Sequence, residues 1–121
     1  MSDDRRRFSR IPFDAPVRLQ QDDWQAKAEL LDISLRGLLV MQPDNWNQAD
    51  SSQPVQVVIE LSSLEQIHME AQPVFIREGL LGLECRHLDL DSTSHLKRLI
   101  MLNLGDDALE RELAALYDLD L

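Results

Sequence analysis

The chain has 121 residues, of which 44% are hydrophobic and 28% charged, and its formal net charge is -10. This length fits one compact domain with a core of its own, and the composition is that of a folded, soluble chain rather than a disordered one. The strong acidity disfavours binding to nucleic acid polymers, because that activity draws most of its affinity from an extended basic surface.

No apolar run approaches the roughly 20 residues that a membrane-spanning helix needs. The N-terminus is rich in Asp and Arg, where a secretory signal would be apolar. We therefore expect no membrane insertion and a cytoplasmic location. The single Cys85 cannot form an internal disulfide, and we expect it to be a small core residue rather than a nucleophile.

Short apolar stretches with period-two alternation follow one another along most of the chain. Residues 11–16 are expected to be an extended linker, because Pro12 and Pro16 remove backbone donors and disfavour a helix. Strands are then predicted over residues 17–20, 24–30, 38–41, 55–61, 67–77 and 81–86, the third from a continuous apolar run short enough for a buried strand and most of the others from alternation. Pro73 interrupts the fifth of these strands and must lie at an edge or a bulge. Trp46, in the polar connection before the fourth strand, is either a lid over the core or a surface aromatic at a binding face.

The period becomes helical near the C-terminus. Residues 91–94 offer several N-cap candidates, Leu96 and Ile100 fall at helical spacing, and Gly105 is placed to end the helix. A second helix, with an acidic face expected in solvent, is predicted within residues 106–121.

These elements imply a mainly β fold, because six short strands joined by turn signals are typical of an antiparallel barrel or sandwich. The helices are expected to pack on the mouth of the barrel. We divide the chain into a flexible Arg-rich arm over residues 1–12, an antiparallel β-barrel over residues 13–90 and a C-terminal helical segment over residues 91–121.

Two polar stretches stand out. The first carries four arginines within six residues of an acidic chain, Arg5, Arg6, Arg7 and Arg10. The second runs from Asp32 to Gly37 and forms a polar turn between two apolar strands. Guanidinium groups bind phosphates bidentately and stack on bases, so the two stretches indicate a site for a small, multiply phosphorylated ligand that carries a base.

No catalytic or metal-binding constellation is visible in the sequence. The three histidines are dispersed, no glycine-rich loop opens a helix, and no Ser sits in a nucleophile elbow. We therefore predict that the chain is not an enzyme and holds neither a metal nor a cofactor.

The two polar stretches also match known motifs. Arg6-Arg7-Phe8-Ser9-Arg10 fits RxxxR, and Asp32-Ile33-Ser34-Leu35-Arg36-Gly37 fits (D/N)xSxxG. In their order and spacing they resemble the motifs of PilZ domains, the bacterial receptors for cyclic dimeric GMP (c-di-GMP). The resemblance covers nearly the whole chain, which we expect to be a stand-alone protein of this family. It implies a six-stranded antiparallel PilZ-type β-barrel, with the ligand held across its outer surface by the N-terminal arm.

The resemblance also implies roles for the motif residues. Arg6 and Arg10 are the motif pair that binds the ligand, Arg5 or Arg7 supplies a further contact, and Arg36 is counted with them. Asp32 would accept hydrogen bonds from a guanine edge, Ser34 would offer its hydroxyl, and Gly37 would permit a positive φ or close approach of the ligand. The structural alternative is that Asp32 and Ser34 only close an Asx-type turn and the arginine run is a solubilising tail.

The leading hypothesis is a c-di-GMP receptor that relays binding by ordering its N-terminal arm and changing the surface it offers to a protein partner. The alternative is a PilZ-like interaction scaffold that binds no nucleotide. A third possibility, a small barrel that binds single-stranded RNA, is disfavoured by the acidity of the chain and the lack of clustered aromatic residues.

Overall fold

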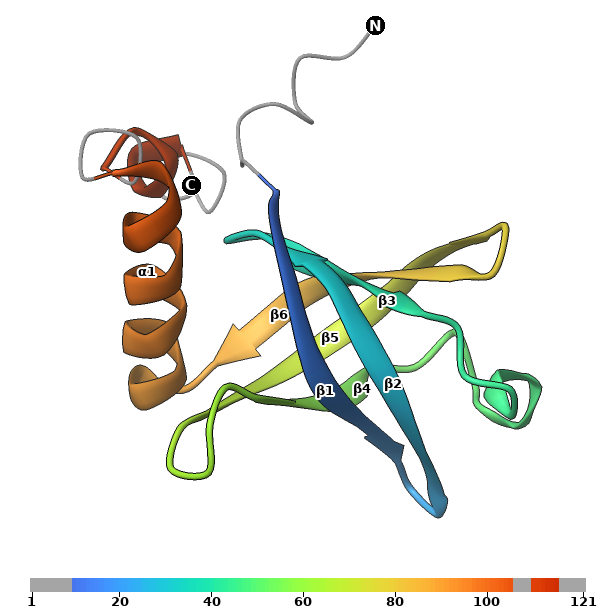
Figure 1. Ribbon diagram of the computed structural model, residues 1–121. Coiled ribbons are helices and arrows are strands. Elements are labelled where there is room, and N and C mark those ends of the chain that lie inside the picture. Colours follow the sequence, from blue (N-terminus) through green and yellow to red (C-terminus); the bar gives the residue numbers. More distant parts are fainter. Residues whose placement is uncertain (1–9, 106–109, 116–121) are drawn as a thin grey trace, which may run out of the picture.

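The computed structural model describes residues 10–105 and 110–115. Within them, six antiparallel strands close into a barrel in the order β1-β2-β3-β6-β5-β4, and one long helix stands beside it (Figure 1). The elements are β1 (Ile11–Gln21), β2 (Trp24–Ile33), β3 (Gly37–Met41), the 3-10 turn η2 (Trp46–Gln48), β4 (Val55–Glu60), β5 (Gln66–Arg77), β6 (Leu80–Leu88) and α1 (Leu90–Leu104). Residues 110–115 form a short second helical stretch. The predicted antiparallel barrel is confirmed, and the sandwich is excluded.

The core fills the inside of the barrel, because alternate residues of each strand point inward. In β1, Val17 and Leu19 are buried while Arg18 and Gln20 are exposed. Residues from all six strands contribute, among them Leu30, Ile33, Val40, Val55, Val57, Ile59, Ile67, Met69, Leu81 and Leu83. The polar faces of the strands are left outside, where a ligand can reach them.

Strand β1 begins at Ile11, so the predicted linker over residues 11–16 is wrong. Ile11 is buried and lies opposite Ile33 of β2, and a bulge follows between Pro12 and Ala15. Pairing of β1 with β4 starts only at Val17. The first half of β1 therefore has one free edge, where prolines are tolerated because no partner strand needs their missing N–H groups.

The fold decides the predictions for Pro73 and Trp46. The register of β5 against β6 shifts between Pro73 and Phe75, so Pro73 lies at a bulge, as predicted. Trp46 is 4% exposed and packs edge-on against Trp24, with 5.4 Å between the ring centroids. Trp46 is thus part of the core, which agrees with a lid and excludes a surface aromatic at a binding face.

Helix α1 is fixed to the barrel at its N-terminal half. Its N-cap is Asp89, not a residue of the predicted 91–94 stretch, and the Asp89 carboxylate accepts a hydrogen bond of 2.7 Å from the backbone N–H of Ser92. The buried Ser92 hydroxyl in turn accepts from the His68 N–H of β5 at 2.7 Å. Leu96 is buried on the same side of the helix. The helix ends at Gly105, at a φ of 92°, as predicted.

No helix in the described parts of the chain is both long enough and apolar enough to cross a bilayer.

Candidate functional site

A surface cavity of about 140 Å³ lies where β1 begins, β2 ends and β3 begins, next to the β5–β6 hairpin. Its wall includes all the described residues that the sequence predicts for the ligand site, Arg10, Asp32, Ser34, Arg36 and Gly37. Arg5, Arg6 and Arg7 lie outside the described residues. Arg10, the last residue of the first motif, therefore lies at the same place on the barrel surface as the second motif.

The strand register explains why they meet. Because Ile11 lies opposite Ile33, the residue before β1 is brought to the end of β2, where the 34–36 turn begins. Arg10 Nε is 4.0 Å from Asp32 Oδ1. Strand β3 then runs back along β2 and pairs on its other side with β6. The wall thus combines four separate stretches of the chain, residues 10, 32–38, 74–75 and 82–84, which the strand pairing of the barrel brings together.

Ser34 is occupied within the turn. The hydroxyl of Ser34 accepts a hydrogen bond of 3.2 Å from the backbone N–H of Arg36, and its own N–H donates to the Gly37 carbonyl at 2.8 Å. Its residue surface is only 8% exposed. Ser34 therefore shapes the loop that presents its neighbours, in keeping with the turn-closing alternative for this residue.

Gly37 serves the packing of two strands. A Cβ atom at this position would collide with the backbone carbonyl oxygen of Leu83 in β6. Among the described glycines, only Gly79 and Gly105 have a positive φ. Glycine is therefore required at position 37 because β3 approaches β6 closely, and not because the backbone is left-handed. The sequence did not suggest this explanation.

Asp32 and Arg10 form a weak pair at the mouth of the cavity. The Asp32 side chain is 20% exposed and that of Arg10 60% exposed. Burial raises the pKa of the Asp32 carboxyl above its ordinary value of 3.8, and the positive charge of Arg10 opposes this shift. An exposed pair at this distance contributes at most about 1 kcal/mol, so Arg10 can exchange Asp32 for a ligand phosphate at little cost.

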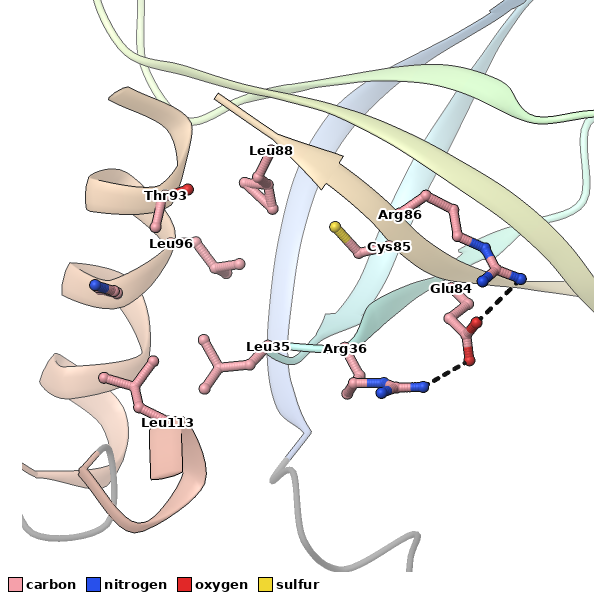
Figure 2. A pocket seen from close by; sticks show the side chains of 10 residues that line it. Leu35, Arg36, Glu84, Cys85, Arg86, Leu88, Thr93, Leu96 and Leu113 are labelled. Carbon is pink, nitrogen blue, oxygen red and sulfur yellow. Dashed lines mark hydrogen bonds and ion pairs between the residues drawn. The ribbon is translucent and has the colours of Figure 1, made fainter. Parts of the chain in front are cut away.

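Glu84 lies on the opposite wall and was not predicted. Its carboxylate accepts from Arg36 Nη2 at 3.0 Å and pairs with Arg86 Nη2 at 3.3 Å (Figure 2). One carboxylate thus holds two guanidinium groups at the border of the cavity. No sequence signal marked Glu84, because its position opposite Gly37 depends on the β3–β6 register.

Phe75 was also missed by the sequence prediction. Its ring lies over Gly82, where a side chain would collide with it, and the guanidinium of Arg77 is 5.8 Å from the ring centroid. The aromatic ring therefore stands partly exposed beside the charged groups of the cavity, where a nucleobase could stack on it. Phe75 lies opposite Gly82 because of the register shift at Pro73. The sequence alone therefore could not indicate that this aromatic ring lines the cavity.

No group of three or more His, Cys, Asp or Glu residues in the described part of the chain is arranged to hold a metal ion. The cavity instead offers guanidinium groups, two partly buried carboxylates and an aromatic face. This set of groups suits a ligand that carries both phosphate and base.

A closed six-stranded barrel with such a cavity at the start of its first strand defines a small ligand-binding domain. The family model of the PilZ domain matches residues 4–102. The chain belongs to the PilZ domain family.

Three solved structures share this fold. The inhibitor of motility MotI/DgrA of Bacillus subtilis is 21% identical, with a TM-score of 0.63, over 84% of this chain and 52% of that one. The PilZ domain of CeSA from a cellulose-synthesizing bacterium is 23% identical, with a TM-score of 0.57, over 77% and 95%. The PilZ domain of YcgR from Escherichia coli, solved with c-di-GMP, is 19% identical, with a TM-score of 0.64, over 94% and 98%. The chain spans about half the length of MotI/DgrA and nearly all of the other two domains.

Proposed function

We propose that the chain is a receptor for c-di-GMP, which binds at the cavity between Arg10, Asp32 and the 34–37 turn. The observation that carries the proposal is that Arg10 lines the same cavity as Asp32 and the 34–37 turn. Family membership and the c-di-GMP bound to the YcgR domain support the choice of ligand. The protein is then a regulatory binding domain, not an enzyme, and works without a metal or cofactor.

Each group has a part in this proposal. Arg10 leaves Asp32 to bind a phosphate or a guanine edge, since a guanidinium matches both bidentately. Asp32 accepts from guanine N–H groups, and Phe75 stacks on a base. The cavity of about 140 Å³ is smaller than the roughly 300–1,000 Å³ of ordinary small-molecule pockets. Arg5, Arg6 and Arg7 are therefore assigned the remainder of the ligand.

The proposed relay runs through the N-terminal arm. Binding orders the part of the arm that precedes β1 over the ligand and changes the surface that a protein partner in the cytoplasm meets. Amide hydrogen exchange tests this step. We expect c-di-GMP to slow exchange at residues 5–11 while the amides of β4 are unchanged, and equal rates at residues 5–11 with and without ligand would contradict the relay.

Calorimetric titration of the purified chain tests the receptor itself, with GTP and a short single-stranded RNA as controls. We expect c-di-GMP to bind saturably, and we expect neither GTP nor the RNA to bind. Absence of c-di-GMP binding would overturn the proposal, and binding of the RNA alone would favour the single-stranded RNA hypothesis.

A second candidate is a PilZ-like interaction scaffold that binds no nucleotide. It is favoured by the structural roles of Ser34 and Gly37, because turn closure and strand packing account for both without a ligand. This candidate predicts a folded chain that binds a protein partner equally well with and without c-di-GMP.

A further inference from the structure

A second and larger cavity, of about 390 Å³, separates the barrel from the C-terminal helices (Figure 2). Its volume lies within the range of small-molecule pockets, roughly 300–1,000 Å³. Four leucines reach into it from the 34–36 turn, from β6, from α1 and from the second helical stretch, namely Leu35, Leu88, Leu96 and Leu113. The leucine wall is aliphatic throughout, so it offers a base no aromatic face on which to stack.

The polar part of the wall is mostly cationic. Arg36, Arg86 and Lys97 line the cavity, while Glu84 is the one carboxylate among its described lining residues. Glu84 pairs with both arginines, and the described lining residues hold three positively charged side chains and one carboxylate. Lys97 has no ion pair within residues 10–105 and 110–115. An anionic group entering beside Lys97 would therefore be favoured in a setting that is partly shielded from water.

We propose that this cavity binds an amphipathic carboxylate, a straight-chain fatty acid of medium length. The hydrocarbon chain lies against the four leucines, and the carboxylate binds Lys97. Apolar walls with a few placed polar groups are what such ligands require, since the walls supply affinity and the charges fix orientation. The site is distinct from the c-di-GMP cavity and does not depend on it, although Arg36 and Glu84 line both.

Decanoate at monomeric concentrations is the probe, and its affinity is measured by calorimetry on the full chain. Each buried methylene adds about 0.8 kcal/mol, or roughly fourfold in affinity, so octanoate, which is two methylenes shorter, should bind about fifteenfold more weakly. Decanol lacks the charge and should bind about tenfold more weakly or worse. Equal affinity for decanoate and decanol, or no dependence on chain length, would overturn the proposal.

Lys97→Ala and Lys27→Ala form a matched pair of variants. Both remove one lysine charge, Lys97 from a half-buried position and Lys27 from an exposed one, but Lys27 lines a different cavity on the outer face of β1, β2 and β4. We expect Lys97→Ala to weaken decanoate binding about tenfold and Lys27→Ala to leave it unchanged. Equal loss in both variants would show non-specific attraction to surface charge and contradict the site.

Cys85 gives an independent readout, because this thiol lines the cavity and is the single cysteine of the chain. Decanoate should slow alkylation of Cys85 at alkaline pH, where the thiol, with its pKa raised by burial to about 11, becomes reactive. Unchanged alkylation at saturating decanoate would place the ligand elsewhere. Binding to phosphatidylglycerol vesicles without binding of free decanoate would replace the proposed pocket with a lipid surface.

Discussion

At Gly37, two strands approach so closely that no side chain fits. The atom in the way is a backbone oxygen of Leu83, which cannot move without shifting β6. At Gly82, by contrast, the obstacle is the ring of Phe75, which can rotate away. Two glycines in neighbouring strands therefore differ in what an added methyl group would cost.

We predict that Gly37→Ala destabilises the chain by about 1–3 kcal/mol, the usual cost of overpacking against fixed groups. Gly82→Ala should cost less and mainly displace Phe75. Urea unfolding of the two variants and the parent measures the difference. A smaller loss of unfolding free energy in Gly37→Ala than in Gly82→Ala would contradict this account of the β3–β6 contact.

Asp32 should make ligand binding sensitive to acid. Burial raises the pKa of the Asp32 carboxyl above 3.8. The ionised carboxylate accepts hydrogen bonds from the N–H groups of a guanine edge, whereas the protonated carboxyl carries an O–H that would face those donors. We therefore expect c-di-GMP affinity to fall as the pH drops through this raised pKa. The same raised pKa has the opposite effect on folding stability. Burial disfavours the charged carboxylate, so protonation of Asp32 as the pH falls stabilises the folded chain.

Affinity measured over a series of pH values, in the parent and in Asp32→Asn, checks this prediction. The variant should bind more weakly at neutral pH and lose the acid-dependent fall that Asp32 causes. A parent and variant with the same pH profile would remove Asp32 from the site.

At the scale of elements, the packing of α1 against β5 includes one buried hydroxyl group. Ser92 is 1% exposed, and its oxygen is the acceptor for the His68 N–H of β5. Removing the oxygen leaves a buried donor without a partner, at a cost of about 1–3 kcal/mol. We predict that Ser92→Ala lowers the free energy of unfolding by this amount, as measured by chemical denaturation.

Ser94→Ala is the control on the same helix, because Ser94 is exposed and makes no hydrogen bond to the barrel among the described residues. It should leave stability nearly unchanged. Equal stability of the Ser92→Ala and Ser94→Ala variants would mean that α1 is held by its apolar residues alone.

Most elements were predictable because each strand buries one face. Alternation or, for residues 38–41, a short continuous apolar run marked the six strands, and Gly105 marked the end of α1. The start of β1 was missed because local rules count Pro12 and Pro16 against a strand, whereas a free sheet edge tolerates them. The N-cap was placed too late because Asp89 lies before the Ser-rich stretch that attracted the prediction.

At the scale of the whole molecule, the sequence predicted the two motifs but not the rest of the cavity wall. Arg10 and Asp32 belong to local patterns that can be recognised in isolation. Glu84 and Phe75 enter through the β3–β6 register and the bulge in β5, which only the closed barrel determines. The acidic end also differs from expectation, because Glu112 is 7% exposed and, among the described residues, one of its carboxylate oxygens has no hydrogen-bond partner.

The receptor proposal depends most directly on Arg10, and Arg18 provides a matched comparison. Both are exposed arginines that pair with a single carboxylate, but Arg18 lies further along β1 and outside the c-di-GMP cavity. A charged hydrogen bond is worth roughly 1.5–3 kcal/mol, so Arg10→Ala should weaken c-di-GMP binding about ten- to a hundredfold in calorimetry. Arg18→Ala should leave the affinity unchanged, and neither variant should unfold the barrel. If Arg10→Ala binds c-di-GMP as tightly as Arg18→Ala and the parent, the cavity at the start of β1 is not the ligand site.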